Sequence, residues 1–159
     1  MEIDAMLCDH VQAAENKLFV SGGGVMRSWV SPQPPHVIMV GVAAVVRVPY
    51  TATNQAHTLT ITLIDEDGNG VSPFVPEGRP DPGPIRGELS FNLGRPPGLS
   101  PGEAQPYCLA ANFNIGLRQL GGYTFELAID GSKVKELSLR VAAAPPTMGL
   151  IQPGGPLAS

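Results

Sequence analysis

The chain has 159 residues, of which 43% are hydrophobic and only 15% are charged, and its formal net charge is −4. This length predicts one domain with a core of its own. Nucleic acids and anionic membranes both require a basic surface, and the Lys and Arg residues form no cluster, so we expect neither as a partner. The 19 glycines and 17 prolines, concentrated between patterned segments, favour an all-β protein with many turns.

The amino terminus predicts a cytoplasmic location. It has neither the basic region nor the apolar region of a secretory signal. The longest apolar run, Val37 to Val46, is too short to span a bilayer as a helix. We therefore expect Cys8 and Cys108 to be reduced thiols that pack as small hydrophobic side chains.

The first third of the chain predicts four strands. Residues 3–11, 18–20 and 25–30 form short alternating or apolar segments. The glycine run in Ser21–Gly24 predicts a bulge or a sharp corner where backbones approach closely. Residues 37–48 form a longer segment with little alternation, which predicts a strand covered on both faces. The cover is either the remainder of the same domain or a partner subunit.

The remaining chain predicts five strands and one long loop. Residues 58–64 alternate Thr with Leu and Ile, which is typical of a half-buried strand. Residues 71–86 are rich in proline and predict an irregular loop, after which residues 87–93 and 107–114 return to strand patterns. The segment Gly121–Val141 alternates on both sides of an Asp-Gly turn and predicts a closing antiparallel hairpin.

Together these elements predict an all-β protein, an antiparallel β-sandwich of the Ig-like kind. A closed barrel is disfavoured because the strands are uneven in length and the connections are long. We expect the sandwich to occupy residues 1–143 and a Pro/Gly-rich extension to occupy residues 144–159. The extension carries no charge and has no periodic pattern.

Chemistry-bearing residues are sparse. Asp65, Asp67 and Asn69 match the first half of an EF-hand loop, but Pro76 stands where a bidentate Glu is needed, so an acidic turn is the stronger interpretation. Cys8 and His10 lie two residues apart without a further ligand or an orienting group. We expect no catalytic residue, no resident metal and no cofactor.

Six short motifs occur in a fixed order: Leu7–His10, Lys17–Gly24, His57–Leu59, Leu63–Gly68, Gly94–Leu99 and Gly121–Tyr123. As a set they resemble DUF6941, a family of short bacterial, mostly actinobacterial, proteins of unknown function. The resemblance covers residues 2–141. It implies a small cytosolic β-domain and brings no activity or catalytic residue with it.

The leading functional expectation is a non-enzymatic interaction or assembly module that binds protein and self-associates into a homo-oligomer. This expectation is based on the low fraction of charged residues, the strand at residues 37–46 that is apolar on both faces, and the uncharged extension at residues 144–159. The alternative is a module that binds a small ligand or calcium through the 65–70 loop. The candidate interface residues are Val40, Val42, Trp29, Met148, Leu150 and Ile151.

Overall fold

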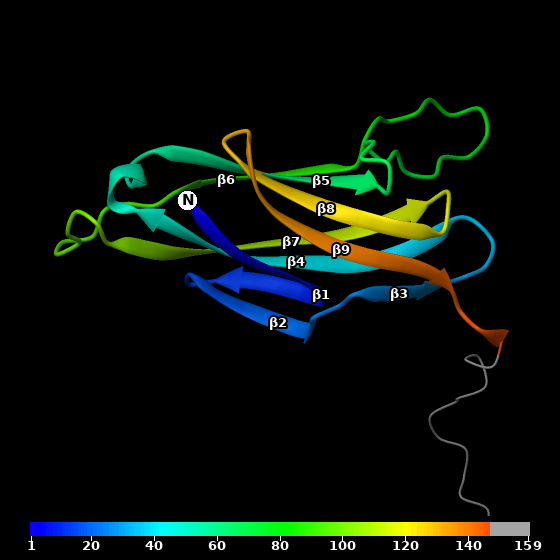
Figure 1. Cartoon of the computed structure of the whole chain (residues 1–159), viewed down its shortest axis with the longest axis horizontal. Helices are drawn as coiled ribbons and strands as arrows, with labels where there is room; N and C mark the ends of the chain where they lie inside the picture. The colour runs from blue at the N-terminus through cyan, green and yellow to red at the C-terminus, as the bar shows by residue number, and fades with distance from the viewer. Residues whose placement is uncertain (147–159) are drawn as a thin grey trace, which may run out of the picture.

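The computed structural model describes residues 1–146, which fold into two packed β-sheets and a single turn of 3-10 helix (Figure 1). The strands are β1 (Glu2–Ala14), β2 (Lys17–Gly23), β3 (Arg27–Val30), β4 (His36–Pro49), β5 (Ala56–Asp65), β6 (Arg86–Asn92), β7 (Ala104–Leu117), β8 (Gly121–Ile129) and β9 (Ser132–Ala143), and the 3-10 turn η1 is Tyr50–Ala52. Each expected strand is present, so the all-β, two-sheet fold is confirmed.

The sheets contain four and five strands, in the orders β2-β1-β4-β7 and β3-β9-β8-β5-β6. All neighbouring strands are antiparallel except β3 and β9, which run parallel. The expectation of a wholly antiparallel sandwich is therefore wrong for β3. The reason is visible in Figure 1, where the chain leaves β2 and continues in the same direction into β3 instead of reversing.

The glycine run at the end of β2 allows the chain to change sheets. Gly22 and Gly24 have φ values of 61° and 82°, a region that residues with a Cβ rarely adopt. A Cβ on Gly22 would also stand 2.0 Å from an Asp9 carboxylate oxygen. The amides of Gly24 and Val25 both donate to the carbonyl of Leu7, at 2.9 and 3.1 Å. The predicted corner is thus confirmed.

The core lies between the two sheets and follows the period of two that defines a strand. β4 directs Ile38, Val40, Val42, Ala44, Val46 and Val48 inward. The opposite sheet supplies the inward side chains Leu59, Ile61, Leu63, Phe125, Leu127 and Leu139. These twelve side chains are at most 3% exposed, so the centre of the sandwich is dry and closely packed.

The outer face of β4 is covered by the β1–β2 hairpin. β1 pairs with β4 only from Glu2 to Cys8, and the rest of the hairpin then lies over the sheet. There Cys8, Val11 and Ala43 form a second buried cluster, against which Leu18 and Ala110 pack. The apolar residues on both faces of β4 are therefore explained by cover from the same chain.

Asn112 of β7 fastens the hairpin to the sheet. Its Oδ1 accepts from the Val11 amide at 3.0 Å, and its Nδ2 donates to the Val11 carbonyl at 2.8 Å. The side chain reaches across β4 at Gly41, where a Cβ would stand 2.8 Å from Cys8 Sγ and 2.9 Å from Asn112 Oδ1. Only glycine leaves room for this crossing.

The closing hairpin of β8 and β9 forms as predicted. Asp130 and Gly131 have φ values of 50° and 83°, as a two-residue turn of this kind requires. At the other end of β8, Glu66 Oε1 accepts from the Gly122 amide at 3.1 Å and from Arg140 at 2.8 Å. The glycine is needed there because a Cβ would stand 2.5 Å from that oxygen.

A buried histidine ties this turn to β5. His57 Nδ1 lies 2.7 Å from Asp130 Oδ2 and Nε2 lies 2.8 Å from the Ala52 carbonyl oxygen, so both ring nitrogens face acceptors and the geometry favours the doubly protonated, charged ring. Burial opposes this charge, but the carbonyl and the carboxylate outweigh it and raise the pKa of His57. Hydrogen bonds from His57 and from the Thr58 amide lower the pKa of Asp130.

We expect Gly41→Ala to lower the free energy of unfolding by about 2 kcal/mol, because overpacking a filled site typically costs that much. Gly94→Ala is the matched control, since no atom lies within 4 Å of a Cβ built there. Urea denaturation of the two variants measures the difference. Equal stabilities would contradict the crossing of Asn112 over Gly41.

We expect stability to be greatest between about pH 4 and pH 6.5. The His57 contribution is complete below its unfolded pKa and is lost as the pH rises through its raised folded pKa. The Asp130 contribution is present above its unfolded pKa and is lost as the pH falls through its lowered folded pKa. Thermal unfolding across pH 3.5–9 measures the profile.

His57→Gln is the test variant for this pH profile. It should cost about 2 kcal/mol at pH 5.5, a typical value for hydrogen bonds of a buried charged group, and should flatten the alkaline decline. An alkaline decline that persists unchanged in the variant would show that another group causes it.

Candidate functional site

Sheet edges are the places where a β-sandwich most readily accepts another chain, because their backbone N–H and C=O groups face outward. The edges of the described sheets are β2, β3, β6 and β7. Three of these strands are short and charged: β2 carries Lys17, β3 carries Arg27, and β6 carries Arg86 and Glu88. β7 has 14 residues and no charged side chain.

The backbone of β7 is capped at both ends of its outer side. At one end, the side chain of Asn16 bonds to the Pro106 carbonyl and the Cys108 amide, each at 2.8 Å. At the other end, the Phe74 amide donates to the Gly116 carbonyl at 2.7 Å. In an antiparallel strand every second residue turns its backbone groups to the same side. Ala110, Asn112 and Asn114 therefore face outward between the caps, with no described strand beside them.

A groove runs beside this part of β7. Its volume is about 410 Å³, and its walls come from the end of the 66–85 loop and from residues 112–116 of β7. The lining is mostly apolar, including Pro82, Pro84, Ile85, Phe113 and Ile115. The ring of Phe113 lies over Gly87 of β6, where a Cβ would stand 3.1 Å from it, and so closes the sandwich beneath the groove.

We define the open edge as Ala110, Asn112 and Asn114 together with this groove. Sequence reasoning predicted the strand at residues 107–114 but not its exposure at an edge. The available signal was the uncharged run from Ala104 to Leu117. That Asn16 and Phe74 cap the strand depends on contacts between distant segments, for which the sequence gives no local pattern.

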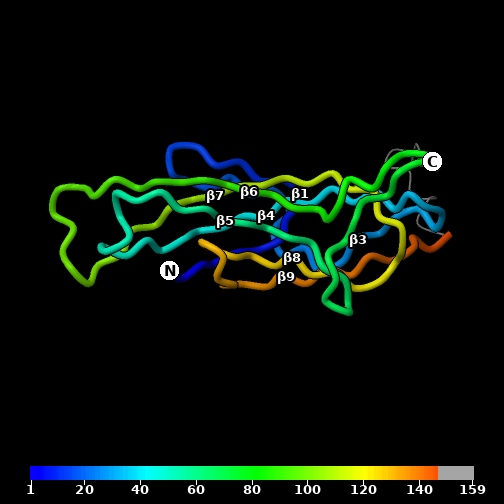
Figure 2. Tube along the Cα trace, turned by 90° about the horizontal axis from the view of Figure 1, so that it is seen from above, coloured from blue at the N-terminus to red at the C-terminus, as the bar shows by residue number. Residues whose placement is uncertain are grey.

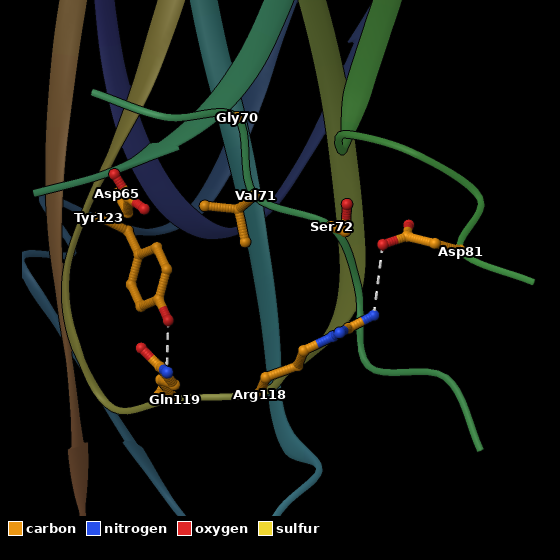
Figure 3. A pocket seen from close by; sticks show the side chains of 8 residues that line it. All are labelled: Asp65, Gly70, Val71, Ser72, Asp81, Arg118, Gln119 and Tyr123. Carbon is orange, nitrogen blue, oxygen red and sulfur yellow. Dashed lines mark hydrogen bonds and ion pairs between the residues drawn. The ribbon is translucent and has the colours of Figure 1, made fainter. Parts of the chain in front are cut away.

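A second pocket, of about 270 Å³, lies between β8 and the 66–85 loop and is drawn in Figure 3. Tyr123 donates its hydroxyl proton to the Gln119 carbonyl at 2.6 Å, and Arg118 lies 3.5 Å from Asp81 across the pocket. Burial, and then the carboxylates of Asp65 and Glu66, raise the pKa of Tyr123. The polar groups of this pocket are largely paired with one another, so they hold the loop in place.

The acidic turn satisfies its own hydrogen bonds. Asp65 Oδ1 accepts from the amides of Asp67 and Asn69, at 3.0 and 2.9 Å, which is the usual role of Asp in a tight turn. Among residues 1–146 there is no group of three or more His, Cys, Asp or Glu side chains arranged to hold a metal ion. The geometry at Asp65, Asp67 and Asn69 is accounted for by the turn alone.

Cys8 and His10 differ in their surroundings. Cys8 is fully buried in the cluster beneath the hairpin, whereas His10 is exposed. Burial, and then the charge of Asp9, raise the pKa of the Cys8 thiol. A raised pKa disfavours the thiolate that nucleophilic attack or metal binding requires. Cys108 is a free, partly exposed thiol.

The expected interface residues fall into three groups. Val40 and Val42 are 3% and 0% exposed and face the opposite sheet, so they belong to the core and not to a surface; the exposed large hydrophobic residues of this strand are Val37 and Met39. Trp29 is 44% exposed on β3, with the Arg27 guanidinium 5.2 Å from its ring centroid. Met148, Leu150 and Ile151 lie outside the described residues.

The fold and the edge define a class of protein: an all-β, two-sheet domain whose longest edge strand is uncharged and open at its centre. Within the described part of the chain, no helix is long and apolar enough to cross a membrane. Residues 3–142 match the model of DUF6941, a family of unknown function, and the chain belongs to this family. The resemblance expected from the six motifs is thereby confirmed. A comparison with curated proteins gave no match.

Proposed function

We propose that this protein is a non-enzymatic, self-associating module built on an Ig-like sandwich, and that its open edge on β7 forms the contact between copies. The contact is a β-augmentation, in which an extended segment of one copy adds a strand to the sheet of another. The main-chain hydrogen bonds of such a contact give affinity, and alternate side chains in a neighbouring groove give specificity.

The strand order supports the Ig-like assignment. β1-β4-β7 and β5-β8-β9 correspond to the A-B-E and C-F-G neighbours of an Ig domain, and β6 takes the place of the strand added beside C. Tyr123 supports it further. It stands near the start of the strand equivalent to F, and its hydroxyl bonds to a backbone carbonyl four residues upstream, as in a tyrosine corner.

The observation that carries the functional proposal is the contrast among the edge strands. Charged side chains on an edge are a common defence against unwanted pairing, because a second strand would have to desolvate them. β6, the other edge on the same side of the sandwich, has the ion pair between Arg86 and Glu88. β7 has no such charge at any of its 14 positions. An edge without charged side chains that is open over residues 110–114 is suited to pairing with a short segment.

The alternative of calcium binding at the 65–70 turn has weaker support. An oxygen of Asp65 already accepts two backbone amides, and Ca²⁺ prefers six to eight oxygen ligands that are free to converge on it.

We expect the wild-type chain to form a dimer or a higher closed oligomer at micromolar concentration, and Asn114→Lys to weaken this association at least tenfold. Asn114 is exposed on the open edge, so a lysine there leaves the core unchanged and places a charge where the added strand must lie. Sedimentation velocity over a range of concentrations measures both.

Ser90→Lys is the matched control for that variant. Ser90 is also exposed on an edge strand, β6, so the substitution adds the same charge to an edge that is not expected to pair. A wild-type monomer at 100 µM would falsify self-association. Equal weakening by both variants would contradict a contact confined to β7.

A further inference from the structure

We infer that the strand received by the open edge is part of the carboxyl-terminal segment of a second copy, centred on Met148–Ile151. This inference rests on the proposed self-association and adds the identity of the segment that binds. Three observations support it: the open edge is short and capped, the edge and the tail are both uncharged, and the tail leaves the sandwich at a suitable place.

The caps on β7 favour a single extended segment over a second β7. The open part of the edge, residues 110–114, spans only about 17 Å at the rise of an antiparallel strand. Two β7 strands paired about Asn112 would each bring an Asn16 turn and a Phe74 segment, which project from the outer side of the strand at both ends. The caps of one copy would then clash with the caps of the other. A single extended segment carries no such caps, so it can pair with residues 110–114 alone.

The tail matches the open edge in chemistry. Residues 144–159 contain no charged side chain, and β7 and most of the groove lining are likewise uncharged. In an extended segment Met148 and Leu150 share one face, because side chains alternate along a strand. With Gly149 between them, these two side chains can enter the groove beside Phe113 and Ile115 while the backbone pairs with β7. Arg86, at the edge of the groove, is already paired with Glu88.

The tail leaves the sandwich in a suitable place. The Ala144 amide is held by the Val30 carbonyl at 2.9 Å, so the chain is fixed up to that residue. The end of β9 and the 66–85 loop, which forms one wall of the groove, lie at the same end of the molecule in both Figure 1 and Figure 2. A segment of thirteen residues reaches about 43 Å when extended, enough to bridge two copies that approach at this end.

The test compares two variants of the 159-residue chain that differ only in where the tail carries a new charge. We expect Leu150→Glu to weaken self-association at least tenfold, because a carboxylate would have to leave water for a groove lined mostly by apolar side chains. Ser159→Glu adds the same charge at the last residue, beyond the pairing segment, and should associate like the wild type. Sedimentation velocity and native mass spectrometry give the association state.

A synthetic peptide of residues 145–159 provides an independent readout. Added to the wild-type chain, it should compete with the tails and dissociate the oligomer. In amide NMR spectra of Leu150→Glu, the peptide should shift the resonances of Ala110, Asn112 and Asn114. Peptide binding that leaves these resonances unmoved would overturn the assignment of the tail to β7.

The remaining outcomes separate this inference from the proposed function. If Leu150→Glu associates as strongly as Ser159→Glu while Asn114→Lys is weakened, the tail inference fails and self-association through β7 stands. If the wild type is a monomer, self-association itself fails. If that monomer shows slow amide exchange at Asn114 that becomes fast in Leu150→Glu, the tail binds its own chain and not a second copy.

Discussion

The constraint on which this structure depends is that β4 is apolar on both faces, so that its inner face and the middle of its outer face are buried, while Val37 and Met39 near its start stay exposed. Burial of each aliphatic side chain stabilises the folded state by about 1.5–3 kcal/mol, so exposing several of them on either face would lower the stability substantially. The opposite sheet covers the inner face. The β1–β2 hairpin covers the middle of the outer face by leaving the sheet after Cys8 and folding across β4. The hairpin is therefore needed as a cover, and its turn comes to rest at the far edge of β7.

The open edge follows from that cover. When the hairpin crosses β4, Asn112 fixes it at Val11 and Asn16 reaches the outer side of β7 near Cys108. The same crossing that buries the apolar face thus caps one end of the edge. The 66–85 loop caps the other end through Phe74. The part of β7 that remains open lies between these two segments, the β1–β2 turn and the 66–85 loop.

The sequence was sufficient to predict the strands because each one either follows the period of two or forms an apolar run, and because Gly, Pro, Asp or Asn residues separate them. It also predicted that β4 is covered on both faces, but it placed Val40 and Val42 at an interface when they face the core. Alternation shows which residues share a face and not which face meets water. The parallel pairing of β3, the crossing at Gly41 and the caps on β7 are contacts between segments far apart in the chain, so local patterns do not encode them.

The two caps also explain how an uncharged edge avoids unlimited assembly. A long, flat and uncharged edge strand templates open-ended stacking, because every added strand offers a new edge of the same kind. On β7 only five residues are open, and the caps on either side prevent a second sheet from aligning along the whole strand. An isolated segment that fills this part of the edge presents no capped sheet of its own for further pairing. The edge is therefore restricted at its two ends by the caps, whereas β2, β3 and β6 are restricted by charged side chains, and the caps keep sheets from stacking edge to edge along the whole of β7.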